Sequence, residues 1–181
     1  MGKIQRHSSQ RSEKADKHNC KMIERITNPD KFKKAIEDID VLFKHENANM
    51  SHVCGLKHNK ETIINSFSNN KILSFDVFVW ANYENGKYDA IGIFINDKNI
   101  KFGQTILSEF LWLSKNPRAG FKILKEATKL AREKNMKYIS LSTVENHPLW
   151  KRNERFYEKL GFKKDCTTFI GKLWTEEHQR K

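Results

Sequence analysis

The sequence predicts an α/β (mixed α+β) domain whose central sheet is mixed, mostly antiparallel and flanked by helices. Alternating apolar residues over 72–80, followed by a hairpin turn signal, indicate antiparallel strands. A strand–turn–helix–strand–helix order over 108–162 indicates parallel strands joined by a crossover helix. An amphipathic helix over 121–135 provides an apolar stripe to cover this sheet.

Length and composition indicate a single globular domain. The chain has 181 residues, of which 38% are hydrophobic and 11% aromatic, and it contains no internal repeat. We expect a flexible basic arm over 1–20, which has almost no apolar side chains, and one domain over 21–181. No apolar run reaches the roughly 18–20 residues that a membrane span needs. The three cysteines are odd in number and form no C-x-x-C pair, which argues against a disulfide framework and fits a reducing compartment.

The formal net charge of +12 predicts attraction to polyanions such as nucleic acid, acidic membranes or a phosphorylated cofactor. A cofactor needs only a local basic patch, so it does not account for the whole excess. We expect the basic arm to be a possible point of polyanion contact, with a simple solvated tail as the alternative.

The N-terminal part is expected to contain a short strand over 22–26 and two helices. Asn28-Pro29 has the pattern of a helix start, with Asn at the N-cap and Pro at the first helical position. The apolar residues that follow are spaced on one helical face: Phe32, Ile36, Ile39 and Phe43. Residues 45–58 are predicted to be a loop, and 60–67 a second short helix.

The period then changes to that of strands. Alternation over 72–80 predicts a half-buried strand, Asn85-Gly86 a hairpin turn, and 90–95 the return strand. Two further elements complete the antiparallel part, a turn over 96–99 and a third strand over about 105–113.

The C-terminal part holds the parallel unit. The strand ending at Leu113 leads into a short basic turn over 115–120, which opens the helix over 121–135. A small basic turn before a helix presents backbone N–H groups and a positive helix end to an anion. The remaining elements are a strand over 138–142, a helix ending near Phe162 and a closing strand over 167–173.

Two stretches of this unit resemble motifs of the GCN5-related N-acetyltransferase (GNAT) family. FYEKLGF at 156–162 resembles the family motif near the end of its fourth helix. RAGFKIL at 118–124 resembles the acetyl-CoA pyrophosphate loop where it enters the third helix. The resemblance covers about 72–173 by element order and about 113–162 by motif. In the loop the chain departs from the family: aligned on Gly120, Lys115 takes the basic position, and Arg118 stands where the family has its first Gly.

The resemblance implies a GNAT-like fold and transfer of an acetyl group from acetyl-CoA to a primary amine of an unidentified acceptor. It implies backbone contacts to the thioester carbonyl from the third strand and phosphate contacts from the following turn and helix. The residues expected to bind acetyl-CoA are Leu111, Trp112, Leu113, Lys115, Arg118, Ala119, Gly120, Phe121, Lys122 and Asn153. No metal is implied, and the three histidines of the loop (His45, His52 and His58) lack a compact ligand spacing. The expected location is the cytoplasm, or a virion if the chain is phage-encoded.

Two residues are candidates for proton transfer. The resemblance places Tyr157 near the CoA sulfur as the acid, and a phenol with a pKa of about 10 is a suitable donor to a thiolate. Strand alternation puts Glu109 among apolar neighbours, on the face of Leu107, Leu111 and Leu113, where burial would raise its pKa toward that of a useful base. The alternatives are that Tyr157 only packs its helix on the sheet and that Glu109 is exposed or salt-bridged. Glu145 and His147 are weaker candidates for the base.

Two other functions stay open. The first is a GNAT fold that has lost catalysis and acts as a structural or interaction protein, for example in a virion. The second is a basic nucleic-acid-binding module that uses the arm over 1–20 and the basic face of the helix over 121–135. That face consists of Lys122, Lys125, Lys129 and Arg132.

Overall fold

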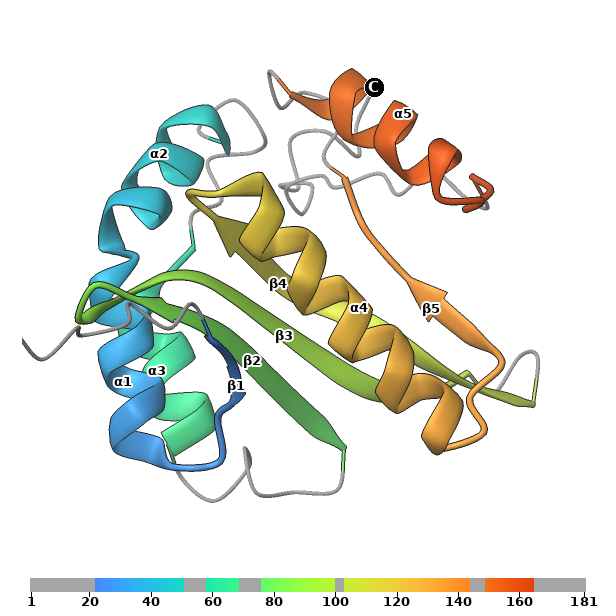
Figure 1. Cartoon of the computed structure of the whole chain (residues 1–181), viewed down its shortest axis with the longest axis horizontal. Coiled ribbons are helices and arrows are strands. Elements are labelled where there is room, and N and C mark those ends of the chain that lie inside the picture. The colour runs from blue at the N-terminus through green and yellow to red at the C-terminus, as the bar shows by residue number, and fades with distance from the viewer. Residues whose placement is uncertain (1–21, 51–57, 69–75, 100–102, 144–148, 165–181) are drawn as a thin grey trace, which may run out of the picture.

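A five-stranded sheet with strand order β1-β2-β3-β4-β5 forms the centre of the structure (Figure 1). The strands are β1 (Met22–Arg25), β2 (Val77–Glu84), β3 (Lys87–Asn99), β4 (Gln104–Ser114) and β5 (Tyr138–Ser140). The first four pair antiparallel, and β5 pairs parallel to β4. This computed structural model describes residues 22–50, 58–68, 76–99, 103–143 and 149–164. The expectations for the arm over 1–20, for a closing strand over 167–173 and for His52, Glu145 and His147 lie outside these residues.

Helices cover both faces of the sheet, as Figure 1 shows. They are α1 (Pro29–Asp38), α2 (Asp40–Met50), α3 (Lys60–Ser68), α4 (Pro117–Glu133) and α5 (Trp150–Lys159). The side chains of α1 and α3 form one core cluster with one face of the strands, and those of α4 form a second cluster with the other face. The predicted mixed sheet flanked by helices is confirmed.

Strand β2 is buried on both faces, which corrects the expectation of a half-buried strand. Val77 and Val79 pack toward α1 and α3, while Phe78 and Trp80 pack toward α4 and are only 1% and 5% exposed. Alternation of apolar and aromatic residues therefore reflects two different cores here, not one core and solvent.

The helix start at Asn28-Pro29 is confirmed. The Asn28 side chain accepts hydrogen bonds from the backbone N–H groups of Asp30 and Lys31 at 2.8 and 3.1 Å. The predicted apolar face is buried, but it belongs to two helices because the first helix ends at Asp38. The Asp38 carboxylate accepts hydrogen bonds from Lys34 and from the Tyr88 backbone N–H, which fastens this helix end to β3.

Two predicted irregular segments are regular in the structure. Residues 45–50 belong to α2 rather than to a loop. Residues 96–99 belong to β3 and pair with 104–107, so the predicted turn there is wrong. Asn96 is a turn former in isolation, but here its backbone N–H and its side-chain Nδ2 both donate to Asp76, which holds it in a strand. The Asn85-Gly86 turn is confirmed, with φ of 54° and 81° at the two residues.

Helix α4 begins at Pro117, four residues before the predicted start. Asn116 is its N-cap and accepts a hydrogen bond from the Arg118 N–H at 3.0 Å. The connection from β4 is therefore only Lys115 and Asn116, and most of the predicted basic turn is the first turn of the helix. The cause is the Asn-Pro pair, which is the same start signal as Asn28-Pro29.

Candidate active site

Strands β4 and β5 stop pairing midway along β4. Their parallel pairing runs from Ile106 opposite Tyr138 to Ser108 opposite Ser140 and ends there, although β4 continues to Ser114. At the same place β4 has a bulge, which a break in the register of its pairing with β3 reveals. A bulge bends its strand and increases the local twist. The sheet therefore opens at the carboxyl ends of two parallel strands, where α/β sheets commonly bind ligands.

The bulge also decides which way Glu109 points. Glu109 pairs with Phe94 and Leu111 pairs with Ile93, so Phe110 is the extra residue. Opposed residues share a face, and Phe94 packs toward α4 whereas Ile93 packs toward α1 and α3. Glu109 therefore lies on the α4 face.

This placement corrects part of the sequence-based expectation. Glu109 shares its face with Leu107, which packs toward α4, but not with Leu111 and Leu113, which pack toward α1 and α3. The prediction assumes that side chains alternate regularly along the strand. The extra residue at Phe110 interrupts this alternation, so residues after the bulge point to the opposite face from the one predicted.

Glu109 and Tyr157 meet at the backbone of Ser142. The Ser142 N–H donates a hydrogen bond to Glu109 Oε2 at 3.0 Å. The Tyr157 hydroxyl donates to the Ser142 carbonyl oxygen at 3.3 Å. A carboxylate from β4 and a phenol from α5 are thus held on the two polar groups of one residue, just beyond the last β4–β5 pair. These side-chain bonds satisfy backbone groups where the strand ladder has ended.

The protonation of both side chains is shifted by their surroundings. Burial raises the pKa of the Glu109 carboxyl to about 7, although the Ser142 N–H opposes this by stabilising the charged form. Burial, and next the negative charge of Glu109, raises the pKa of the Tyr157 phenol above its usual value. Near neutral pH the site therefore holds a carboxyl that can gain or lose a proton and a phenol that keeps its proton.

Trp112 connects this pair to the start of α4. Its indole stacks on Tyr157 with ring centroids 6.3 Å apart and an interplanar angle of 18°. Its Nε1 is buried and has no hydrogen-bond partner in the described part of the chain. A Cβ added to Gly120 would lie 3.4 Å from this nitrogen, an ordinary contact, and 3.2 Å from Ser114 Cβ, which would have to shift by a few tenths of an ångström. An orphaned buried donor is uncommon and indicates a position where a water or ligand atom would be stabilised.

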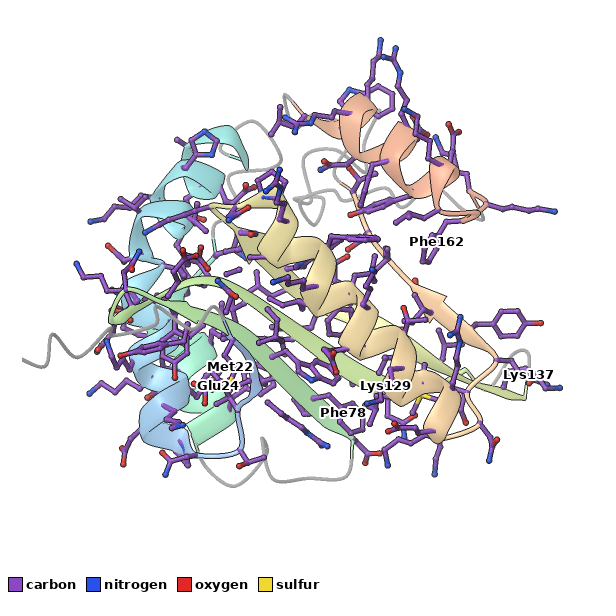
Figure 2. The ribbon with its side chains drawn as sticks, viewed as in Figure 1. Met22, Glu24, Phe78, Lys129, Lys137 and Phe162 are labelled. Atoms are coloured by element: carbon purple, nitrogen blue, oxygen red, sulfur yellow. The ribbon has the colours of Figure 1, made fainter. Side chains whose placement is uncertain are left out.

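Aromatic contacts attach α5 to the rest of the fold. Along α5, all of which the structure describes, no residue is buried, and Phe156 meets Phe121 of α4 edge-on at 6.2 Å. Phe162 lies beneath α5 on the side that faces β5 (Figure 2), with its ring 6.2 Å from that of Tyr157. The position of Tyr157 therefore depends on ring contacts more than on deep burial of its helix.

The N-terminus of α4 is the expected phosphate site, and its backbone donors are partly used within the protein. The Asn116 side chain occupies the Arg118 N–H, and Pro117 has no N–H to offer. Ser114 Oγ donates to the Asn116 carbonyl and accepts from the Asn116 N–H, which fixes the connection. The Ala119 N–H is the next donor of this turn.

The other residues expected to bind the cofactor are divided between two places. Arg118 and Lys122 are exposed on the first two turns of α4, and Asn153 lies one turn before Tyr157 on α5. Lys115 is directed elsewhere, because its Nζ donates to the Asp38 carbonyl oxygen at the end of α1, at 3.4 Å. The structure thus brings together β4, the start of α4 and one face of α5, but not the Lys115 ammonium group.

Sequence reasoning missed the backbone of Ser142 and the side chain of Trp112. Ser142 follows a strand, and a carbonyl that ends a parallel strand beside a predicted catalytic residue is a general signal for such a contact. The ring contact of Trp112 with Tyr157 has no comparable signal, since it depends on how α5 docks.

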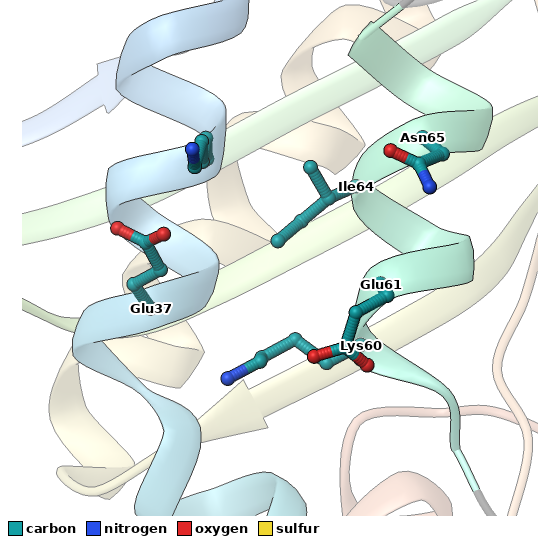
Figure 3. A pocket seen from close by; sticks show the side chains of 6 residues that line it. Glu37, Lys60, Glu61, Ile64 and Asn65 are labelled. Atoms are coloured by element: carbon teal, nitrogen blue, oxygen red, sulfur yellow. The ribbon is translucent and has the colours of Figure 1, made fainter.

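A separate hollow lies between α1 and α3, with a volume of about 440 Å³ (Figure 3). Lys33 and Glu37 come from α1, and Lys60, Glu61, Ile64 and Asn65 from α3. Its charges are of both signs, and Lys60 is already paired with Asp40 at 2.9 Å. The opening between β4 and β5 is the better candidate site, because the half-buried Glu109 and Tyr157 with their raised pKa values lie there, whereas the carboxylates that line this hollow are exposed.

Within the described residues, no set of three or more His, Cys, Asp or Glu side chains is placed to hold a metal ion. No helix in the same residues combines the length and apolar composition required to cross a bilayer.

Solved structures share this fold. An aminoglycoside acetyltransferase from an uncultured soil metagenomic sample matches with a TM-score of 0.61 and 12% identity, over 84% of this chain and 96% of that one. A ribosomal-protein-alanine N-acetyltransferase from Brucella melitensis matches with a TM-score of 0.60 and 8% identity, over 86% and 100%. A GNAT family acetyltransferase from Staphylococcus aureus matches with a TM-score of 0.54 and 13% identity, over 84% and 98%. No family model and no curated protein sequence matches the chain. The chain has the fold of the GNAT-family acetyltransferases.

Proposed function

We propose that this protein transfers an acetyl group from acetyl-CoA to a primary amine. The observation that carries the proposal is the pair of Glu109 and Tyr157 on the two sides of Ser142, at the point where β4 and β5 part. The shared fold supports acyl transfer, and the neighbour named as an N-acetyltransferase supports nitrogen as the acceptor atom.

The two side chains suit the two proton transfers of this reaction. The amine attacks the thioester carbonyl carbon, the C–S bond breaks, and an amide and a CoA thiolate result. The attacking amine must lose a proton, and Glu109, with a pKa raised to about 7, is the group that can accept it at neutral pH. The thiolate must gain a proton, and Tyr157 keeps one because burial raises the pKa of its phenol. At neutral pH Tyr157 therefore holds the proton that its role requires, and Glu109 is ionised, as a base must be, in about half of the molecules.

Backbone and side-chain donors would hold the rest of acetyl-CoA. We assign the thioester carbonyl to the backbone of β4 at 111–113, beyond the bulge, because this stretch has no β5 partner. We assign the pyrophosphate to the α4 N-terminus, with Arg118, Ala119 and Lys122 beside it. The buried Trp112 Nε1 is a further donor between these two places. Asn116 would have to release the Arg118 N–H for this turn to bind the pyrophosphate fully.

A non-catalytic role of the same fold is the second candidate, and one observation favours it. The Asn116 side chain already caps the helix that would bind the pyrophosphate, and Pro117 removes another donor. A protein that never binds acetyl-CoA would keep this cap without cost. The two candidates therefore differ in cofactor affinity before any acceptor is known.

Calorimetric titration of the full chain with acetyl-CoA, and separately with CoA, tests the proposal. We expect saturable binding of both ligands, with Arg118→Glu weakening it by about tenfold or more, since a charged hydrogen bond contributes about 1.5–3 kcal/mol. Lys98→Glu, on the exposed end of β3, is the matched charge-reversal control and should bind as the wild type does. Absence of binding to the folded wild type would contradict the proposal and favour the non-catalytic role.

A further inference from the structure

Within the described residues, the excess of positive charge lies on one part of the structure. The described residues between 117 and 164 include thirteen Lys and Arg residues and four Asp and Glu residues. The described residues between 22 and 116 include nine basic and twelve acidic residues. Among the described residues, the excess therefore belongs to α4, α5 and their connections, while the residues between 22 and 116 are slightly acidic in total. Like charges gathered on one side create a local potential that a uniform distribution would cancel.

Helix α4 carries a straight row of these charges. Lys125, Lys129 and Arg132, which we call the α4 row, are spaced four and three residues apart, so their Cβ atoms lie about 5–6 Å apart on one face. All three are exposed, and Figure 2 shows Lys129 projecting from the helix. In the described part of the chain, the one ion pair of the row is Lys129 with Glu133, at 4.0 Å and largely exposed. Such an exposed pair contributes little free energy, so Lys129 can leave Glu133 for another anion at little cost.

The row lies too far from the α4 N-terminus to serve a ligand there. Lys129 is twelve residues beyond Pro117, or about 18 Å along the helix axis. This exceeds the screening length of about 8 Å at physiological ionic strength. The pyrophosphate of a bound acetyl-CoA therefore does not account for Lys129 and Arg132.

The surroundings of the row favour a nucleic acid over other polyanions. The apolar residues of α4 are buried except Phe121, which is half-buried against Phe156, so the face of the row has no apolar stripe to insert into a bilayer, as membrane-surface helices do. The centre of a protein–protein interface is depleted of charge and enriched in aromatic side chains, whereas this face is charged along its length. A phosphate backbone is bound largely through evenly distributed Lys and Arg side chains, without an apolar centre.

We propose that the α4 row binds the phosphate backbone of a nucleic acid, without reading its sequence. This surface is separate from the proposed acetyl-transfer site and does not depend on it. The chemistry is common to DNA and RNA, so the experiment includes a duplex of each.

Fluorescence anisotropy with short fluorescein-labelled duplexes, measured over a series of NaCl concentrations, tests the proposal on the full chain. The variant is Lys125→Gln, Lys129→Gln and Arg132→Gln together. Its matched control is Lys33→Gln, Lys87→Gln and Lys98→Gln, which removes the same charge from exposed positions on α1 and β3. We expect the row variant to bind about tenfold or more weakly and to reduce the slope of log K against log salt by about 2 to 3, since each phosphate contact contributes about 0.9. The control should bind within about twofold of the wild type.

Several results would overturn the proposal. One is no binding of either duplex by the wild type, and another is an equal loss in the row variant and its control, which would indicate net charge alone. Tighter binding to phosphatidylserine vesicles or to polyglutamate than to either duplex would assign the row to another partner. Arg132→Gln alone, with thermal unfolding of each variant, guards against an effect of misfolding. Acetyl-CoA affinity should be unchanged in the row variant, because the two surfaces are separate. Failure of the acetyltransferase proposal would therefore not affect the interpretation of the duplex-binding measurements.

Discussion

The indole of Trp112 and the phenol ring of Tyr157 stack almost parallel, at 18°, and join β4 to α5 across the opening where β4 and β5 have separated. This contact holds the Tyr157 ring where its hydroxyl donates to the Ser142 carbonyl oxygen. Because α5 itself has no buried residue, removal of the Trp112 ring should change the position and the surroundings of the Tyr157 ring.

Trp112→Ala should therefore lower the pKa of Tyr157 toward the ordinary value of about 10, since the phenol loses the burial that raises it. Trp112→Phe retains a ring and should restore most of the shift. Absorbance titration of tyrosinate formation checks this, with Tyr157→Phe identifying the contribution of Tyr157. If the alanine variant titrates as the wild type does, Trp112 does not position Tyr157.

Tyr157→Phe keeps the ring and removes the proton. If Tyr157 protonates the CoA thiolate, turnover should fall on the order of 10²-fold while acetyl-CoA affinity and thermal stability change little. Steady-state kinetics with an acceptor found by screening primary amines would measure this. Tyr138→Phe is the control, because Tyr138 is 56% exposed on β5 and should be silent. Unchanged turnover in Tyr157→Phe would remove it as the acid and leave a water or the Ser142 hydroxyl.

Local signals in the sequence were enough to predict most elements of the fold. Asn28-Pro29 starts α1 through a side-chain cap that needs only nearby residues, and the Asn85-Gly86 turn needs only two residues that accept positive φ. The same Asn-Pro signal is present at Asn116, but the basic residues that follow also predict a phosphate-binding turn, and this second prediction puts the helix start four residues too late. Where two local interpretations compete, the hydrogen bonds of the folded chain decide.

The candidate site was only partly predictable, because its geometry depends on long-range pairing. Glu109 and Tyr157 were identified as candidates, but the bulge at Phe110 is a property of the register between β3 and β4, and no local pattern marks it. The neighbours predicted for Glu109 are therefore partly wrong, and its side chain is half-buried, between the two alternatives that the sequence leaves open. The Trp112 contact needs the docking of α5, which rests on ring contacts between distant segments.

Glu109 should make both activity and stability depend on pH. Its pKa is raised from 4.5 to about 7, so the folded state binds this proton more tightly than the unfolded state. Stability should therefore fall as pH rises from about 4.5 to about 7, by on the order of 3 kcal/mol. Glu109→Gln keeps an oxygen for the Ser142 N–H but cannot ionise, so its free energy of unfolding should exceed that of the wild type above pH 7.

Urea unfolding of wild type and Glu109→Gln across this pH range checks the prediction, and the low-pH end is its internal control, where the two proteins should converge. In kinetics, kcat/KM of the wild type should rise with a midpoint near pH 7, and this rise should be absent in the variant. A stability difference that is independent of pH would contradict the raised pKa, and an unchanged kinetic profile would remove Glu109 as the base.

The Asn116 side chain should stabilise the fold and at the same time weaken acetyl-CoA binding. Its side chain caps α4 by accepting the Arg118 N–H, a donor that the pyrophosphate of acetyl-CoA would also need. Asn116→Ala should lower the free energy of unfolding by about 1 kcal/mol, the usual contribution of a cap. Because this free energy is no longer lost when the ligand displaces the cap, acetyl-CoA should bind about fivefold more tightly.

Asn28→Ala is the matched control, since Asn28 caps α1 before a proline in the same way but lies on the other face of the sheet. It should lose similar stability with no change in affinity. Thermal or urea unfolding and calorimetry with acetyl-CoA measure the two quantities. Weaker binding in Asn116→Ala would show that the Asn116 side chain contacts the ligand rather than competing with it.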